Sequence, residues 1–143
     1  MILIDTNIIS EMIKPKPNAI VKEWIDQQEV LQLFISTVTM AEISYGLNIL
    51  PPDNRRKSLE HAFNKAILEA FANRILSFDE SAAFQYGKLM SERKKLGHPM
   101  GVPDGQIAAI ATAHNAMLAT RNVGDFINCS LQLINPFAHP CSA

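Results

Sequence analysis

Apolar residues along the chain alternate between short unbroken runs and stripes with helical spacing. The first run, from Ile2 to Ile4, leads directly into Asp5, Thr6 and Asn7. A short continuous apolar run that ends in turn-forming residues is typical of a strand buried on both faces, as in a parallel sheet. The sequence therefore predicts a central first strand with Asp5 at its carboxyl end.

Further strands are predicted over residues 30–35, 74–78, 117–120 and 131–134. Helical stripes, with capping residues and prolines at their ends, predict helices over residues 8–13, 19–25, 39–50, 53–71, 81–96 and 103–114. Alternation of strands and helices indicates a parallel sheet with helices on both faces, a three-layer α/β/α fold. We expect one domain over residues 1–135 and a loose C-terminal tail over residues 136–143.

Two helix starts carry polar residues of special interest. Thr6 or Asn7 is expected to cap the first helix, and Thr39 with Glu42 has the spacing of a capping box. Asp5, at the end of a strand, has no evident capping role.

Composition narrows the function. Of the 143 residues, 48% are hydrophobic, and 13 basic and 14 acidic residues leave a formal net charge of -1. This balance argues against a general nucleic-acid binder but is compatible with an RNA substrate held by a local basic patch. Cys129 and Cys141 have neither metal-ligand nor disulfide-framework spacing. No apolar run is long enough for a membrane span, so we expect a soluble cytoplasmic protein.

Acidic or amide side chains follow a strand or begin a helix at Asp5, Glu42, Asp104 and the pair Asn122 and Asp125. Most of these positions also fit a cap, a turn or the helix dipole. Asp5 is harder to explain in that way, because a carboxylate at the end of a buried strand is desolvated. A divalent cation such as Mg²⁺ or Mn²⁺, which prefers oxygen ligands, would compensate for its burial.

Basic side chains occur near two of these positions. Arg93, Lys94 and Lys95 precede Asp104, and Arg121 adjoins Asn122. Each is a candidate phosphate contact. The alternative for residues 93–95 is a solvated helix end whose basic residues are favoured by the dipole.

In combination, four segments resemble the PIN domain, and more closely the VapC-type toxins of bacterial toxin–antitoxin pairs, in the branch of FitB and the plasmid-stability proteins. The resemblance covers residues 1–134. The segments are Ile4-Asp5-Thr6-Asn7, Thr39-x-x-Glu42 before Tyr45-Gly46, Pro103-Asp104 with Ile107-Ala108-Ala109, and Ala119-Thr120-Arg121-Asn122 leading to Asp125-Phe126.

The resemblance implies an endoribonuclease that depends on Mg²⁺ or Mn²⁺, with Asp5, Glu42 and Asp104 as its acidic core. Asn122 stands where the family often has a fourth acid, so the charge there is lost unless Asp125, three residues on, supplies it. Metal chemistry then predicts an activated water, with Asp5 as a direct ligand and Glu42 or Asp104 as the proton acceptor.

The resemblance also implies a VapB-type antitoxin partner, in a homodimer or a toxin–antitoxin hetero-oligomer. Apolar residues of the early helices, around Ile9, Met12, Ile13 and Leu47, offer a groove or a dimer face, if they are not simply core.

Two other functions fit the same residues less well. A haloacid-dehalogenase-like phosphatase needs a second Asp two residues after the first, where Asn7 stands. A catalytically inactive PIN domain would bind RNA or its partner without cutting, and Asn122 is the feature that favours it.

Overall fold

The computed structural model describes residues 1–138. Five parallel strands form one sheet in the order β3-β2-β1-β4-β5. The strands are β1 (Ile2–Ile4), β2 (Leu33–Ser36), β3 (Ile75–Leu76), β4 (Met117–Ala119) and β5 (Leu133–Ile134). The predicted parallel sheet and its central first strand are confirmed. The outer strands β3 and β5 are shorter than predicted, and residues 30–32 form a 3₁₀ turn rather than the start of β2.

The central strand is buried on both faces, which explains its unbroken apolar run. Leu3 and Ile4 are both 0% exposed, yet they belong to different apolar clusters. Ile4 packs with residues of the first four helices, and Leu3 packs with residues of the last two. Successive side chains of a strand point to opposite faces, so both must be apolar here.

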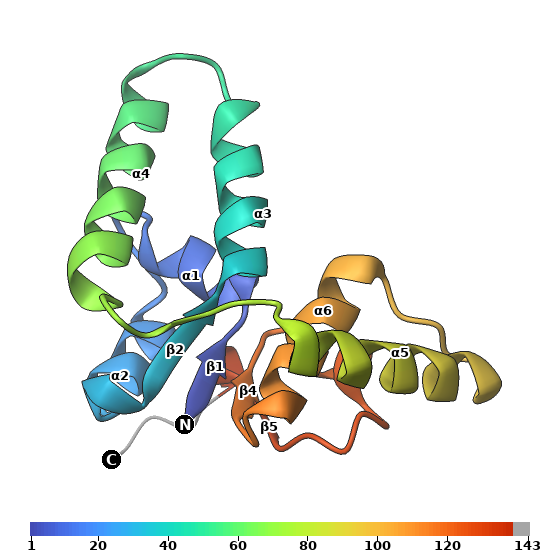
Figure 1. Ribbon diagram of the computed structural model, residues 1–143. Coiled ribbons are helices and arrows are strands. Elements are labelled where there is room, and N and C mark those ends of the chain that lie inside the picture. The colour runs from blue at the N-terminus through green and yellow to red at the C-terminus, as the bar shows by residue number, and fades with distance from the viewer. Residues whose placement is uncertain (139–143) are drawn as a thin grey trace.

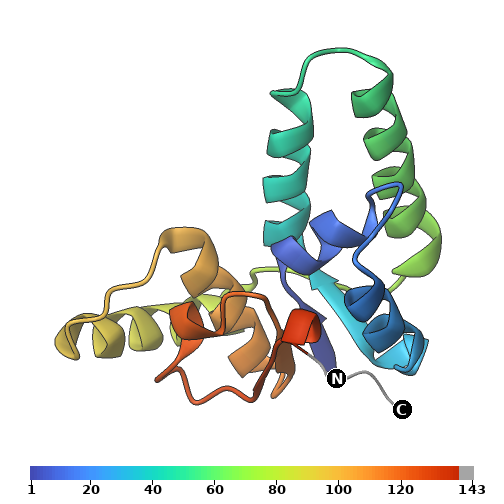
Figure 2. The same ribbon diagram turned by 180° about the vertical axis from the view of Figure 1, so that it is seen from behind.

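Helices cover both faces of the sheet, as predicted. They are α1 (Thr6–Met12), α2 (Ala19–Asp26), α3 (Thr37–Asn48), α4 (Asn54–Lys65), α5 (Glu80–Lys95) and α6 (Val102–Ala113). α3 and α4 form a hairpin that extends away from the sheet, whereas α5 and α6 lie on the other side (Figure 1). The view from behind shows α1 and α2 on the hairpin side (Figure 2). This is the expected three-layer α/β/α arrangement.

Two predicted boundaries differ from the structure. The helix expected to run to Phe71 ends at Lys65 and continues as a π-helical turn over Ala66–Ala70. Pro136–Ala138, expected to begin a loose tail, forms a 3₁₀ turn that packs against α2, with Pro136 buried. The rest of the predicted tail, residues 139–143 with Cys141, lies outside the described residues, and Cys129 is a buried free thiol. None of the helices in the described part is long and apolar enough to cross a membrane.

The strand order reverses at β1, which lies between β2 and β4. The carboxyl ends of strands at such a switch point border a crevice in which α/β proteins bind ligands. The backbone N–H of Asp5 donates to the carbonyl of Ala119 at 2.9 Å, so the residues that follow β1 and β4 meet at this edge.

Candidate functional site

Asp5 lies at the carboxyl end of β1 and is 4% exposed. Its Oδ1 accepts the backbone N–H of Thr6 at 2.8 Å, and Oδ2 accepts Thr120 Oγ1 at 2.7 Å and Asn7 Nδ2 at 3.3 Å. Asp5 is therefore the N-cap of α1, and the expectation that Thr6 or Asn7 would cap this helix is wrong. α1 begins directly after the strand, so the last residue before it must satisfy the free N–H groups.

Burial raises the pKa of the Asp5 carboxyl above its usual value, and the charge of Glu42 adds to the rise. The hydrogen bonds from Thr120, Thr6 and Asn7 act in the opposite direction because they stabilise the carboxylate. The net rise remains. A cation at this position would relieve it.

Glu42, half-buried on α3, faces Asp5 across the hydroxyl of Thr6. Its Oε1 accepts Thr6 Oγ1 at 2.7 Å, and the same hydroxyl lies 3.0 Å from Thr39 Oγ1. The predicted capping box of Thr39 and Glu42 is wrong, because the helix begins earlier. Ser36 is the N-cap and accepts the N–H of Thr39 at 3.0 Å. Glu42 is thereby released from capping and is available to the site.

Asp104 lies in the first turn of α6, after an N-cap, Gly101, that provides no side-chain hydrogen bond. Burial, together with the charges of Asp5, Asp125 and Glu42, raises the pKa of Asp104 to about 6. Among residues 1–138, no group donates a hydrogen bond to its carboxylate. The neighbouring acids therefore raise the pKa of Asp104 by repulsion, and no hydrogen bond to its carboxylate lowers it.

These acids border one polar groove of about 400 Å³ at the carboxyl edge of the sheet. Asp5, Glu42, Asp104 and Asn122 all line it. Asn122 is exposed, and its backbone N–H donates to Thr120 Oγ1 at 3.1 Å. Asp125 does not line this groove. It borders a second polar pocket, on which Asp104 also lies, so its carboxylate stands beside Asp104 rather than in place of Asn122.

Of the predicted phosphate contacts, only Arg121 lines the acidic groove. The guanidinium carbon of Arg121 lies 4.5 Å from the centre of the Phe137 ring, and the backbone N–H of Arg121 donates to Asn7 Oδ1 at 3.1 Å. Lys94 and Lys95 are exposed at the end of α5, away from the groove lining.

Arg93 requires a correction. It is 5% exposed rather than solvated, and its guanidinium donates to three backbone carbonyls, those of His98, Asp125 and Ile127. Because the side chain is buried and its donors bind these carbonyls, it is not available to a phosphate.

Sequence reasoning missed several residues of this site, among them Glu11 and Lys14, which also line the groove. Thr6 and Thr120 supply the hydroxyls that orient the acids, and Phe137 supports Arg121. Thr6 and Thr120 each follow a strand beside a candidate acid, which is the signal that could have identified them. Phe137 gave no such signal, since it was assigned to the tail.

The donor set fits a hard divalent cation. The groove offers carboxylate and amide oxygens without a thiolate or an imidazole among its lining residues, the chemistry that Mg²⁺ and Mn²⁺ prefer. Within residues 1–138, no three acidic, His or Cys side chains stand close enough together to hold a metal ion without rearrangement. The pKa values of Asp5 and Asp104 are nevertheless raised, chiefly by burial and further by the charges of neighbouring acids, and a cation would oppose both effects.

The PIN-domain profile matches residues 2–127, and the chain therefore belongs to the PIN-domain family. Over 137 residues it is 41% identical to the VapC ribonuclease Y4jK of Sinorhizobium fredii, covering 96% of this chain and 98% of that protein. It is 37% identical over 137 residues to Toxin FitB of Neisseria gonorrhoeae, covering 96% and 99%. The crystal structure of FitAcB from that organism matches with a TM-score of 0.89 at 37% identity, covering 97% of this chain and 100% of the other. The structure of FitAB bound to an IR36 DNA fragment gives a TM-score of 0.90 at 36% identity, covering 98% of each chain.

The predicted family is thus confirmed. Membership of this family rules out the phosphatase alternative, and Asn7, at the position where that chemistry needs a second Asp, donates its amide to Asp5.

Proposed function

We propose that this chain is a metal-dependent endoribonuclease, the toxin component of a toxin–antitoxin pair. The observation that carries the proposal is the convergence of Asp5, Glu42 and Asp104, from three separate segments, on one polar groove at the switch point of the sheet. Its named ribonuclease and toxin relatives, matched over nearly their whole length, support the same conclusion.

Asp5, Glu42 and Asp104 would hold the cation, Mg²⁺ or Mn²⁺, with the amide of Asn122 beside them. When bound, such an ion lowers the pKa of a water molecule and polarises the scissile phosphodiester. Asp104 is better placed than Glu42 to accept the proton of the attacking water. Glu42 Oε1 already accepts a hydrogen bond from Thr6, whereas the Asp104 carboxylate accepts none from residues 1–138.

Arg121 is the phosphate contact that the groove supports best. Its guanidinium carbon lies over the Phe137 ring, both residues line the groove, and Arg121 forms no ion pair within residues 1–138. It therefore offers its donors to an incoming phosphate. Lys94 and Lys95 remain candidates for a more distant part of the RNA chain.

The partner is proposed to be a VapB-type antitoxin, in a complex that also pairs two copies of the toxin. An apolar groove of about 720 Å³ between α1, α3 and α4 adjoins the acidic groove and shares Thr6 and Glu42 with it. Ile13 and Leu47 line it as predicted, although both also belong to the core, whereas Ile9 and Met12 belong to or pack against the core without lining the groove. A segment seated there would reach the acids.

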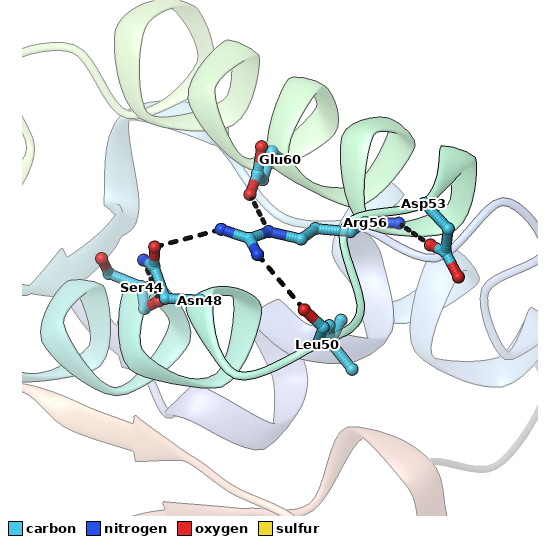
Figure 3. A network of polar contacts seen from close by, with 6 residues as sticks. All are labelled: Ser44, Asn48, Leu50, Asp53, Arg56 and Glu60. Atoms are coloured by element: carbon cyan, nitrogen blue, oxygen red, sulfur yellow. Dashed lines mark hydrogen bonds and ion pairs between the residues drawn. The ribbon is translucent and has the colours of Figure 1, made fainter.

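The walls of this apolar groove are held together at the tip of the hairpin (Figure 3). Arg56 on α4 donates to Asn48 Oδ1 and to the carbonyl of Leu50, at 3.2 Å each, and pairs with Glu60 at 2.6 Å. Asp53 caps the same helix through the N–H of Arg56. The hairpin thus presents a fixed surface, which lowers the entropic cost of binding.

RNA cleavage by the purified chain tests the function. We expect cleavage with Mg²⁺ or Mn²⁺, none with EDTA, and loss of cleavage in Asp5→Asn. Asp79→Asn is the matched control, because Asp79 is also a helix N-cap, for the N–H of Ala82, outside the groove. RNA binding without cleavage in the parent would favour an inactive PIN domain. As part of the proposal, the enzyme acts in the cytoplasm, where its RNA substrates lie.

A further inference from the structure

Arg93 is a buried charge that the proposed reaction does not use. It is 5% exposed, and within the described residues no carboxylate pairs with it. Instead, Nε donates to the His98 carbonyl at 2.8 Å, Nη2 to the Asp125 carbonyl at 3.1 Å, and Nη1 to the Ile127 carbonyl. Burying a charge is costly unless it is fully hydrogen-bonded, so a guanidinium in this place requires an explanation.

The carbonyls that Arg93 binds belong to two segments, one that precedes Asp104 and one that carries Asn122 and Asp125. Residues 97–101 lead directly into the first turn of α6, where Asp104 lies. Residues 122–127 carry Asn122 and Asp125. Because the Asp104 and Asp125 carboxylates accept no hydrogen bond from residues 1–138, their positions depend on the backbone that bears them.

We propose that Arg93 is a positioning residue that fixes Asp104 against the Asn122–Asp125 segment. This inference rests on the proposed function. The planar fork of an arginine reaches several carbonyls at once, which a lysine ammonium cannot do in the same geometry. A displacement of about 1 Å in a reacting group can cost about 100-fold in rate, so a clamp on both segments affects catalysis without contacting the substrate.

A residue that merely stabilises the fold must be distinguished from one that positions the acids. Arg74 is the matched control. It also bridges backbone carbonyls, those of Leu33 and Ala70, but it lies at the β2–β3 side of the sheet, away from the acidic groove. Arg93→Ala and Arg74→Ala should both lower the melting temperature, and only Arg93→Ala should impair the site.

Chemical rescue gives the specific readout. Arg93 borders a polar pocket of about 430 Å³, which provides a route for a free guanidinium ion. In Arg93→Ala we expect kcat on RNA to fall about 10-fold to 100-fold with little change in KM. Guanidinium, at concentrations far below those that unfold the protein, should restore part of kcat, and urea, a neutral molecule of similar shape, should not. Arg74→Ala should keep the parent kcat and show no response.

Amide hydrogen exchange tests the clamp without reference to cleavage. In metal-free Arg93→Ala, exchange should accelerate both in residues 98–104 and in residues 122–127, and guanidinium should slow it again. A parent that fails to cut RNA would refute the proposed nuclease while leaving this test intact. The clamp is refuted if Arg93→Ala keeps the parent kcat, if guanidinium raises only its melting temperature, or if exchange changes in neither segment.

Discussion

The two halves of the acidic groove are built differently. On the β1–α3 side, Asp5 and Glu42 are oriented by side-chain donors, chiefly the hydroxyls of Thr120 and Thr6. On the α6 side, the Asp104 carboxylate accepts no hydrogen bond from residues 1–138, and the backbone that carries it is tied by Arg93. On the β1–α3 side, hydrogen bonds therefore hold the carboxylates themselves. On the α6 side, hydrogen bonds hold only the backbone near the acid.

The lack of hydrogen bonds to the Asp104 carboxylate lets this side chain respond to the charges around it. Fixed carboxylates repel one another in the absence of a cation, and this repulsion adds to the effect of burial, which is the larger cause of the raised pKa of Asp104. An acid without hydrogen bonds can respond by taking up a proton or rotating, whereas Asp5 cannot move without breaking its contacts. In the proposed site, the β1–α3 side would set where a cation binds, and the Asp104 side chain would adjust to it.

The largest effect on RNA cleavage is expected from a substitution on the β1–α3 side of the groove. Asp5→Asn should lower kcat on RNA roughly 100-fold to 1,000-fold, because a preorganised charge is lost at the reacting centre. The melting temperature of the metal-free protein should not fall, since Asn is also a good N-cap and carries no charge to desolvate. Parent-like cleavage would remove Asp5 from the site. A large loss of stability would show that its role is mainly structural.

An intermediate effect is expected from the hydroxyl that orients Asp5. Thr120→Val keeps the shape of a side chain that is 0% exposed but removes the donor to Asp5 Oδ2. We expect kcat to fall about 10-fold to 100-fold, as for other partners that orient metal ligands. Thr112→Val is the control, because Thr112 donates to the Ala108 carbonyl within α6. Equal loss in both variants would contradict the comparison.

On the α6 side of the groove, the titration of Asp104 should affect the pH dependence of stability. The Asp104 carboxyl ionises near 3.8 when unfolded and at about 6 when folded. Between these values the folded state binds more protons, so the stability of the metal-free protein falls as the pH rises through this window. Asp104→Asn should remove that contribution and raise the melting temperature by about 2–4 °C at about pH 7, with no gain at about pH 4. An identical pH profile of stability in parent and variant would contradict the raised pKa of Asp104.

The smallest effect is expected at the rim. Phe137→Leu removes the aromatic face beneath Arg121, a contact of about 0.5–1 kcal/mol, so KM for RNA should rise about two- to fivefold with kcat unchanged. Phe71→Leu removes a second such pair within residues 1–138, with Arg74, in which the guanidinium carbon lies 5.9 Å from the ring centre. That variant should leave KM unchanged. The same KM in both variants would remove Phe137 from the substrate surface.

The sequence was informative where burial is two-sided or where a strand end fixes a residue. β1 could be predicted because both of its faces need apolar side chains, and its position placed Asp5 at the edge of the sheet. Helix starts were less predictable. Asp5 and Ser36 cap α1 and α3 because each helix follows its strand immediately, and several polar residues in a row left that choice open.

Arg93 was the least predictable residue. A basic cluster at a helix end has the same local sequence whether it is solvated or turned inward. Its acceptors are backbone carbonyls, two of them more than thirty residues away, and a carbonyl leaves no signal in the sequence.

A structure of the protein with bound Mn²⁺, located by its anomalous scattering, would test the central claim most directly. We predict a manganese ion in the groove between Asp5, Glu42 and Asp104, with Asp5 and Glu42 still bonded to Thr120 and Thr6 and with the Asp104 side chain rotated toward the metal. An ion elsewhere, or one that binds only after Asp5 has left Thr120, would contradict the account.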